Sequence, residues 1–240
     1  MIVTKEIEYQ DDGVSCRGYL AYDERNQQPM PGVMVAPDWG GRGEAACAKA
    51  RQLAEMGYAG FAIDMYGNAQ LGHDKVQRRA LMTPFIQDRA RLAARMKAAF
   101  EALTSQSSLI DAKKTAAIGY CFGGLCVLDL ARTGADIRGA VSFHGLLSEP
   151  QGVPQAAIRA KLLVLHGYDD PLVPPEQVTQ FADEMTMKKA DWQVHIYGLT
   201  AHSFTDPKAN DDEMGLHYNK TADSRSWTTT SQFLKEILVL

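Results

Sequence analysis

The chain has 240 residues, of which 45% are hydrophobic and 22% are charged, and this composition is typical of a soluble globular protein. A formal net charge of -4 at pH 7 gives no reason to expect nucleic acid or an anionic membrane surface as a partner. The best apolar run, around residues 121–131, is interrupted by Asp129, so no segment is expected to span a membrane.

The number and spacing of the cysteines help to predict the cellular compartment of the protein and whether it binds a metal. The four of them are scattered without a Cys-x-x-Cys pair, a pattern typical of neither a disulfide scaffold nor a zinc site. The N-terminal stretch MIVTKEIEYQDDG lacks the charged and apolar regions of a signal peptide. We therefore expect a cytoplasmic protein with free thiols available for chemistry, and neither a metal nor another cofactor.

Two β-type segments, at residues 3–9 and 15–22, open the chain. The Asp12-Gly13 pair between them is a strong hairpin signal, and the two segments are predicted to form an antiparallel hairpin at the sheet edge. Short and nearly continuous apolar runs follow, as is typical of strands buried on both faces by helices. These runs lie at residues 32–37, 58–64, 115–120, 139–145 and 161–167.

Longer segments alternate with the apolar runs and predict helices. Pro84 is expected to break or kink the longest of them, and a last strand is predicted at residues 192–198. The alternation indicates one α/β domain over residues 1–240, with a mostly parallel central sheet covered by helices on both faces. The predicted helices lie at residues 44–57, 75–103, 123–134, 175–188 and about 224–240.

A cysteine lies inside the glycine-rich stretch IGYCFGG, directly after a predicted strand. Gly119-Tyr120-Cys121-Phe122-Gly123 matches the G-x-nucleophile-x-G turn, with cysteine in place of serine. The glycines let the chain turn sharply into a helix while the nucleophile holds a strained conformation. The dipole of that helix favours a thiolate at Cys121. The alternative is a buried structural cysteine in a strand-to-helix turn.

The same pattern requires an acid and then a histidine, each in a loop after a strand. Asp170 follows the predicted strand at 161–167, and His202 lies in the loop after the strand at 192–198. His202 is expected to take the proton from Cys121, and Asp170 is expected to orient the imidazole and stabilise its cation. The sequence therefore predicts a Cys-His-Asp catalytic triad.

Other ionisable residues near these strand ends have structural interpretations. We prefer Asp170 to Asp169 because of its offset from the end of the strand, and Asp169 would instead cap the helix that begins near Pro174. His144 and His166 both end apolar runs and are interpreted as structural or pocket-lining groups facing the same cleft. No His-x-x-x-His spacing points to a metal site.

The stretches GYCFGG, HGYDDPLVP and AHSF occur in this order across nearly the full length, and through them the chain resembles the dienelactone hydrolase family, the cysteine branch of the α/β-hydrolases. The resemblance implies the α/β-hydrolase fold. Together with the stretch VAPDWGG, it implies an oxyanion hole built from the backbone N–H groups of Trp39 and Phe122. It also implies that Asp38 contacts and restrains the resting nucleophile, and the alternative for Asp38 is a hydrogen bond to nearby backbone.

The sequence departs from the family pattern at residues expected in the substrate pocket. Members that hydrolyse dienelactone hold its carboxylate with arginines, one of them shortly after the catalytic histidine. Asp206 falls at that place here, and Arg78 or Arg79 would supply the other arginine. We expect Asp206 near the pocket mouth to favour a neutral or cationic ester or lactone, because it would repel a carboxylate. His144, where an aromatic residue is more familiar, is also expected to line the pocket.

The sequence therefore predicts a hydrolase that cleaves a small-molecule carboxylic ester, lactone or thioester through an acyl-cysteine intermediate. One alternative is a non-catalytic α/β-hydrolase-fold protein with a binding or regulatory role, which the fold alone would permit. A complete set of nucleophile, base and acid favours the enzyme. Another alternative, a thiol redox protein, needs a nearby resolving cysteine, whereas Cys126 is expected to point away from Cys121 into the core.

Overall fold

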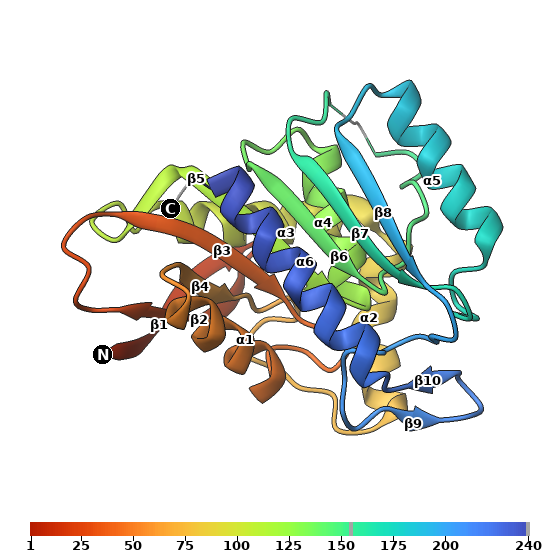
Figure 1. Cartoon of the computed structure of the whole chain (residues 1–240). Helices are drawn as coiled ribbons and strands as arrows, with labels where there is room; N and C mark the ends of the chain where they lie inside the picture. The colour runs from red at the N-terminus through yellow and green to blue at the C-terminus, as the bar shows by residue number, and fades with distance from the viewer. Residues whose placement is uncertain (154–155, 239–240) are drawn as a thin grey trace.

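The computed structural model describes residues 1–153 and 156–238, and its centre is an eight-stranded sheet (Figure 1). The strand order is β1-β2-β4-β3-β5-β6-β7-β8, with parallel pairing from β4 to β8 and antiparallel pairing of β2 with β1 and with β4. The predicted mostly parallel sheet is confirmed. The strands are β1 (Ile2–Asp11), β2 (Val14–Asp23), β3 (Met30–Ala36), β4 (Ala59–Ala62), β5 (Ile110–Tyr120), β6 (Gly139–Phe143), β7 (Lys161–Gly167), β8 (Trp192–Tyr197), and the separate pair β9 (Asn210–Asp211) and β10 (Leu216–His217).

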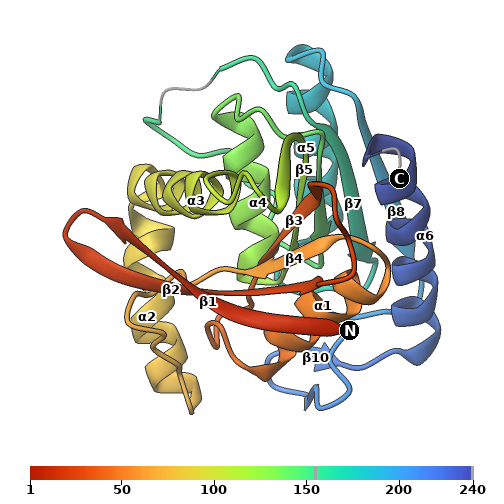
Figure 2. The same ribbon diagram turned by 90° about the vertical axis from the view of Figure 1, so that its left-hand side faces the viewer.

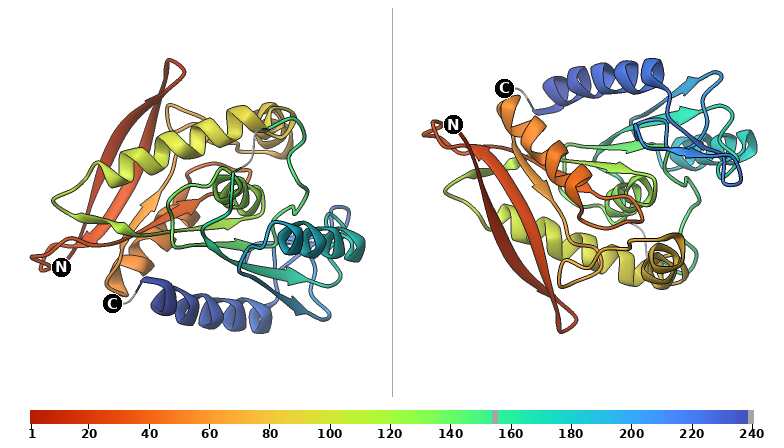
Figure 3. Two further views of the ribbon diagram at one scale, coloured as in Figure 1. Left: turned by 90° about the horizontal axis from the view of Figure 1, so that it is seen from above. Right: turned by 90° about the horizontal axis from the view of Figure 1, so that it is seen from below.

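Helices cover both faces of the sheet, as predicted (Figure 3). Helices α1 and α6 pack on one face, and α3, α4 and α5 contribute to the apolar cluster on the other. Successive residues of β3 alternate between the two clusters, Met34 joining one and Val33 and Val35 the other, as the two-residue period of a strand requires. Among the described residues, no helix is both long and apolar enough to cross a membrane. The helices are α1 (Glu44–Glu55), α2 (Lys75–Gln87), α3 (Arg89–Thr104), α4 (Phe122–Arg132), α5 (Pro175–Met187) and α6 (Lys220–Leu238).

The N-terminal hairpin forms as the sequence predicts. Asp12 and Gly13 connect β1 to β2, and both have positive φ angles, of 47° and 74°. A two-residue turn of this kind matches the twist of the strands it joins, which is why an Asp-Gly pair is favoured there. The register pairs Asp11 with Val14. Figure 2 shows β1 and β2 running together past β4, so the hairpin extends the parallel sheet at one edge.

The helical stretch predicted at residues 75–103 is divided into α2 and α3, but the break is not at Pro84. Pro84 lies inside α2, and the chain leaves the helix four residues later, at Asp88. Proline cannot donate a hydrogen bond from its own nitrogen, but the carbonyl of Pro84 still accepts one from the N–H of Asp88 at 3.1 Å, so the helix continues for one more turn. Asp88 then starts the next helix, because its side chain accepts a hydrogen bond from the N–H of Arg91 at 2.9 Å.

The segment between β8 and α6 contains structure that the sequence did not predict. Strands β9 and β10 form a small sheet, and the N–H of His217 in β10 donates to the carbonyl of His202 at 3.0 Å. Helix α6 begins at Lys220, earlier than predicted, because the side chain of Asn219 accepts hydrogen bonds from two N–H groups of the first turn. The excursion from His202 to Asn219 is therefore a folded unit attached to the end of β8.

Candidate active site

Three side chains at the carboxyl ends of β5, β7 and β8 form a continuous chain of hydrogen bonds. Sγ of Cys121 lies 3.1 Å from Nε2 of His202, and Nδ1 of the same ring lies 2.7 Å from Oδ2 of Asp170. The other oxygen of Asp170 accepts a hydrogen bond from the N–H of Leu172 at 2.8 Å. Because Asp170 and His202 are buried and both carboxylate oxygens are engaged, the imidazole is held in one orientation toward the sulfur.

Asp170, and not Asp169, makes the contact with His202. The backbone N–H of Asp169 donates to the carbonyl of Thr200 at 3.0 Å, which fixes the loop after β7 to the loop after β8. The alternative role of Asp169 as a helix cap is wrong. Helix α5 begins at Pro175, and its capping residue, Pro174, makes no side-chain hydrogen bond.

The backbone at Cys121 explains the glycines around it. Cys121 has a φ of 53° and a ψ of -116°, a conformation that non-glycine residues rarely adopt. The turn is also crowded: a Cβ at Gly119 would lie 2.0 Å from the carbonyl oxygen of Gly123, and a Cβ at Gly123 would lie 2.2 Å from that of Ala36. Only glycine fits at both positions, so the sequence pattern follows from the close packing of β3, β5 and α4.

The surroundings of His202 favour its protonated form. Burial alone would lower its pKa, but the charge of the Cys121 thiolate and the hydrogen bonds to Asp170 and Cys121 outweigh burial and raise the pKa of His202 to about 10. Cys121 is also the capping residue of α4, and the positive end of the helix dipole favours negative charge on the sulfur. The geometry is therefore suited to a thiolate–imidazolium pair.

Two backbone N–H groups near Cys121 have no acceptor among the described residues. Phe122 is the first residue of α4, where N–H groups find no partner within the helix. No acceptor for the N–H of Trp39 occurs in residues 1–153 and 156–238. The loop that carries Trp39 is fixed instead through its carbonyl, which accepts a hydrogen bond from the Tyr66 hydroxyl at 2.8 Å. Both N–H groups are thus free to bind a ligand oxygen.

Asp38 lies in the same loop, and its recorded hydrogen bond is to backbone. Oδ1 of Asp38 accepts from the N–H of Gly40 at 2.6 Å, which matches the alternative stated for this residue. Burial raises the pKa of Asp38, although the Gly40 N–H and the charge of Arg78 oppose this shift. Among the described residues the sulfur of Cys121 has His202 as its hydrogen-bond partner, and no hydrogen bond joins it to Asp38. A restraining role for Asp38 stays a prediction.

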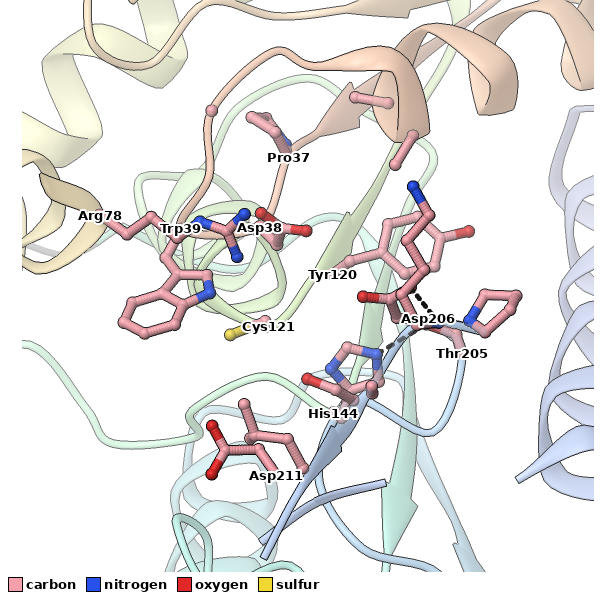
Figure 4. A pocket seen from close by; sticks show the side chains of 18 of the residues that line it. Pro37, Asp38, Trp39, Arg78, Tyr120, Cys121, His144, Thr205, Asp206 and Asp211 are labelled. Atoms are coloured by element: carbon pink, nitrogen blue, oxygen red, sulfur yellow. Dashed lines mark hydrogen bonds between the residues drawn. The ribbon is translucent and has the colours of Figure 1, made fainter. Parts of the chain in front are cut away.

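A cavity of about 320 Å³ opens beside Cys121 (Figure 4). The segment 203–216 supplies nine of the twenty-one lining residues and is therefore the largest part of the wall. The rest comes from the loop after β3, from α1 and α2, and from the ends of β5 and β6. The lining residues are Pro37, Asp38, Trp39, Gly41, Ala45, Ala46, Lys49, Lys75, Arg78, Tyr120, Cys121, His144, Ser203, Thr205, Asp206, Pro207, Lys208, Ala209, Asn210, Asp211 and Leu216.

The cavity contains most of the residues predicted for a substrate pocket. His144, Asp206 and Arg78 line it, but Arg79 does not. Arg79 is exposed on α2, one position away from Arg78 and so on a different face of the helix. Asp206 is exposed, and its Oδ1 accepts a hydrogen bond from the N–H of Lys208 at 2.9 Å.

His144 is held beside His202 as a neutral ring. The ring centroids are 5.0 Å apart in an edge-on arrangement, and Nε2 of His144 lies 2.8 Å from Oγ1 of Thr205. Burial and the neighbouring His202 lower the pKa of His144 well below its ordinary value. Burial also lowers the pKa of His166, which is not in the cavity wall. His144 therefore lines the cavity, whereas His166 lies outside its wall.

The structure also identifies cavity residues that the sequence did not. Lys75 on α2 and Asp211 on β9 both line the cavity and form an ion pair at 2.6 Å. Lys49 on α1 and Tyr120 at the end of β5 also line the cavity. Tyr120 had a detectable signal, since it directly precedes Cys121. Lys49 had none, because a lysine within an amphipathic helix is ordinarily a solvated side chain.

Comparison with known proteins identifies the family of this chain. The model of the dienelactone hydrolase family matches residues 16–238. A dienelactone hydrolase-like promiscuous phosphotriesterase from metagenomic libraries is 41% identical over 98% of each chain, with a TM-score of 0.93. A protein named m3DLH is 39% identical over 99% of each chain, with a TM-score of 0.91. An uncharacterised protein of Caenorhabditis elegans is 40% identical over 149 residues, 61% of this chain and 94% of its own. The chain belongs to the dienelactone hydrolase family and is a hydrolase with the α/β-hydrolase fold.

Proposed function

We propose that the protein hydrolyses a carboxylic ester, lactone or thioester through a Cys121-His202-Asp170 triad. The observation that carries the proposal is the unbroken sequence of hydrogen bonds from Sγ of Cys121 through His202 to Asp170, with the sulfur at the wall of a cavity. A non-catalytic protein has no need for all three groups in this arrangement. The substrate is a small molecule that fits the cavity beside Cys121.

In the first half of the reaction, Sγ of Cys121 forms a bond to the carbonyl carbon of the substrate, and the electron pair of the C=O bond moves onto oxygen. His202 holds the proton that the thiol has lost. When the intermediate collapses, the bond to the leaving oxygen or sulfur breaks, and His202 gives its proton to that atom. The product of this half is an acyl-cysteine and a free alcohol or thiol.

In the second half, His202 takes a proton from water as the water oxygen attacks the acyl carbon. Collapse of the second intermediate breaks the carbon–sulfur bond, releases the carboxylic acid and restores the Cys121–His202 pair. The unpartnered N–H groups of Trp39 and Phe122 are suited to stabilise the oxyanion in both halves. Each such donor contributes about 3–4 kcal/mol in comparable enzymes. Asp170 keeps Nε2 directed at the reacting atoms throughout.

The test is the Cys121→Ala variant, with Cys47→Ala as the control because Cys47 is buried in α1 outside the cavity. For an ester that the wild type hydrolyses, the Cys121→Ala variant is expected to lose about four to six powers of ten in rate, since the members of a triad act as a unit. Mass spectrometry of rapidly quenched wild type is expected to show the acyl group on Cys121. Retention of more than about a tenth of the activity would contradict the mechanism.

Phosphotriester hydrolysis is a second candidate activity. It is favoured by the 41% identity to a protein described as a promiscuous phosphotriesterase, over nearly the full length of both chains. The same thiolate would attack phosphorus in place of carbon and expel the best leaving group. We expect p-nitrophenol release from a p-nitrophenyl dialkyl phosphate by wild type and not by the Cys121→Ala variant. Equal release by both proteins would exclude this activity at the proposed site.

A further inference from the structure

The segment 203–216, which forms the largest part of the cavity wall, is fixed to the rest of the molecule at both ends. Near its start, Oγ1 of Thr205 lies 2.8 Å from Nε2 of His144. Just after its end, the N–H of His217 donates to the carbonyl of His202 at 3.0 Å. Between these points the chain forms β9 and β10, which stand apart from the eight-stranded sheet (Figure 1).

The middle of the segment, residues 206–215, has one polar attachment to the rest of the molecule. Nζ of Lys75, at the start of α2, lies 2.6 Å from Oδ2 of Asp211 and 3.8 Å from Oε2 of Glu213. Within residues 1–153 and 156–238, no other hydrogen bond or ion pair joins residues 206–215 to residues outside 202–219. The position of this part of the wall therefore depends on Lys75.

The ion pair joins two parts of the cavity wall that come from different elements, because Lys75 and Asp211 both line the cavity. The hydrogen bond between them raises the pKa of Lys75 and lowers the pKa of Asp211, so both groups are charged at neutral pH. The pair is nevertheless weak: the side chain of Lys75 is 55% exposed, and exposed ion pairs contribute little and are screened by salt. A contact of this strength can close the wall without preventing it from opening.

We infer that the Lys75–Asp211 ion pair is a latch on the cavity wall that limits the size of the substrates that reach Cys121. With the pair formed, the cavity has a volume of about 320 Å³. With the pair broken, residues 206–215 can move away from α2 about their fixed ends, which enlarges the cavity. The inference rests on the proposed ester hydrolysis and adds a determinant of specificity to it: compact esters and lactones react in the closed state, and bulky ones require the open state.

Alkylation of Cys121 tests the latch without any turnover. N-ethylmaleimide and N-(1-pyrenyl)maleimide carry the same reactive group and no charge, and differ mainly in bulk. Their rates at Cys121 are read by peptide mass spectrometry, since the other three cysteines are buried. Lys75→Met is expected to raise the ratio of the two rates, large reagent to small, by about two- to fivefold, the effect of losing an exposed ion pair. Sodium chloride at about 1 M should raise the ratio in the wild type and have little effect in the variant.

The matched control is Lys161→Met. Lys161 forms an exposed ion pair of the same length, 2.6 Å, with Glu236 outside the cavity, and its loss should leave the ratio unchanged. The reversed pair Lys75→Glu/Asp211→Lys should return the ratio toward the wild-type value. For esters, Lys75→Met is expected to raise the ratio of kcat/KM for p-nitrophenyl diphenylacetate to that for p-nitrophenyl acetate.

The two measurements separate failure of the latch from failure of the proposed reaction. If no ester is hydrolysed, the proposed function fails and the maleimide ratio alone decides on the latch. An unchanged maleimide ratio in Lys75→Met, or an equal rise in Lys161→Met, would overturn the inference. Equal acceleration of both maleimides with a lowered melting temperature would also overturn it, because that pattern indicates general loosening of the fold.

Discussion

Two aspartates near Cys121 differ in how they are connected to its sulfur. Asp170 acts through His202, whose imidazolium it stabilises by a hydrogen bond of 2.7 Å. Asp38 lies in the cavity wall, where Oδ1 is bonded to the N–H of Gly40 and Oδ2 has no hydrogen-bond partner in the described residues. A carboxylate that supports the base and one that repels the thiolate should have opposite effects on the reactivity of the sulfur.

Asp170→Asn is expected to slow the alkylation of Cys121 by iodoacetamide at neutral pH by about tenfold or more. The amide removes the negative charge that raises the pKa of His202, so less of the thiol proton is held by the imidazole. The value of kcat for an ester should fall by about four powers of ten, because the orientation of the ring is lost as well. An alkylation rate equal to that of the wild type would mean that Asp170 does not control the charge of His202.

Asp38→Asn is expected to change the same alkylation rate severalfold in the other direction. Loss of a carboxylate near Cys121 favours the thiolate, and the amide still accepts the hydrogen bond from Gly40, so the loop is preserved. Asp206→Asn, at the exposed cavity mouth, is the matched control and should have a smaller effect. If Asp38→Asn leaves alkylation unchanged or slower, Asp38 has only its structural role in the loop.

At the scale of elements, the turn from β5 into α4 depends on a glycine at position 123. Gly123→Ala is expected to lower ester hydrolysis and Cys121 alkylation by about a hundredfold and to lower the melting temperature. The added Cβ would lie 2.2 Å from a backbone carbonyl oxygen of β3, which cannot move like a side chain. Gly198→Ala is the control, since nothing lies within 4 Å of its added Cβ. Similar activities for the two variants would show that the turn tolerates displacement.

The residues at the strand ends could be predicted from the sequence because short stretches of the chain determine them. The glycines around Cys121 and the alternation of short apolar runs with amphipathic segments both reflect constraints within a few residues of the chain. The order of nucleophile, acid and base along the chain predicted which distant residues would lie close to Cys121. Parallel strands end at one edge of a sheet, so Asp170 and His202 were expected near Cys121 without knowledge of the strand order.

Other features could not be recognised from the sequence, for reasons that differ from one to the next. The helix after Lys75 continues beyond Pro84 because a better stop, Asp88, follows one turn later. The β9–β10 pair is only two residues long on each side, too short to show any periodicity. The sequence predicts that Lys49 is an ordinary solvated lysine, because its contact with Trp227 of α6 is made only in the folded structure. The sequence thus predicts the reacting groups better than the wall that selects the substrate.

At the scale of the whole molecule, the histidines of the site should make stability depend on pH in two directions. The folded pKa of His202 is raised to about 10, against about 6.5 in the unfolded chain. Its stabilising contribution is therefore present in full below about pH 6.5 and is lost as the pH rises through about 10. The difference in free energy of unfolding between wild type and His202→Gln, from urea titrations, should shrink across this range.

His144→Phe provides the contrasting measurement. Because the pKa of His144 is lowered in the folded protein, its contribution is lost as the pH falls below about 6.5, where the unfolded chain takes up a proton. The difference between wild type and His144→Phe should therefore change on the acid side and stay constant on the alkaline side. A difference for His202→Gln that does not vary with pH would mean that the imidazolium is not preferentially stabilised in the folded state.

The contribution of a single contiguous segment, residues 203–216, to the cavity wall has a consequence for how the protein can diversify. Nine of the lining residues come from this segment, whereas the three side chains of the proposed triad lie outside it. Insertions, deletions or exchange of this stretch can therefore alter the range of substrates in one genetic event while the reaction machinery is inherited intact. Relatives with the same triad are expected to differ most in this stretch, and transplanting it between them is the direct route to a change of specificity.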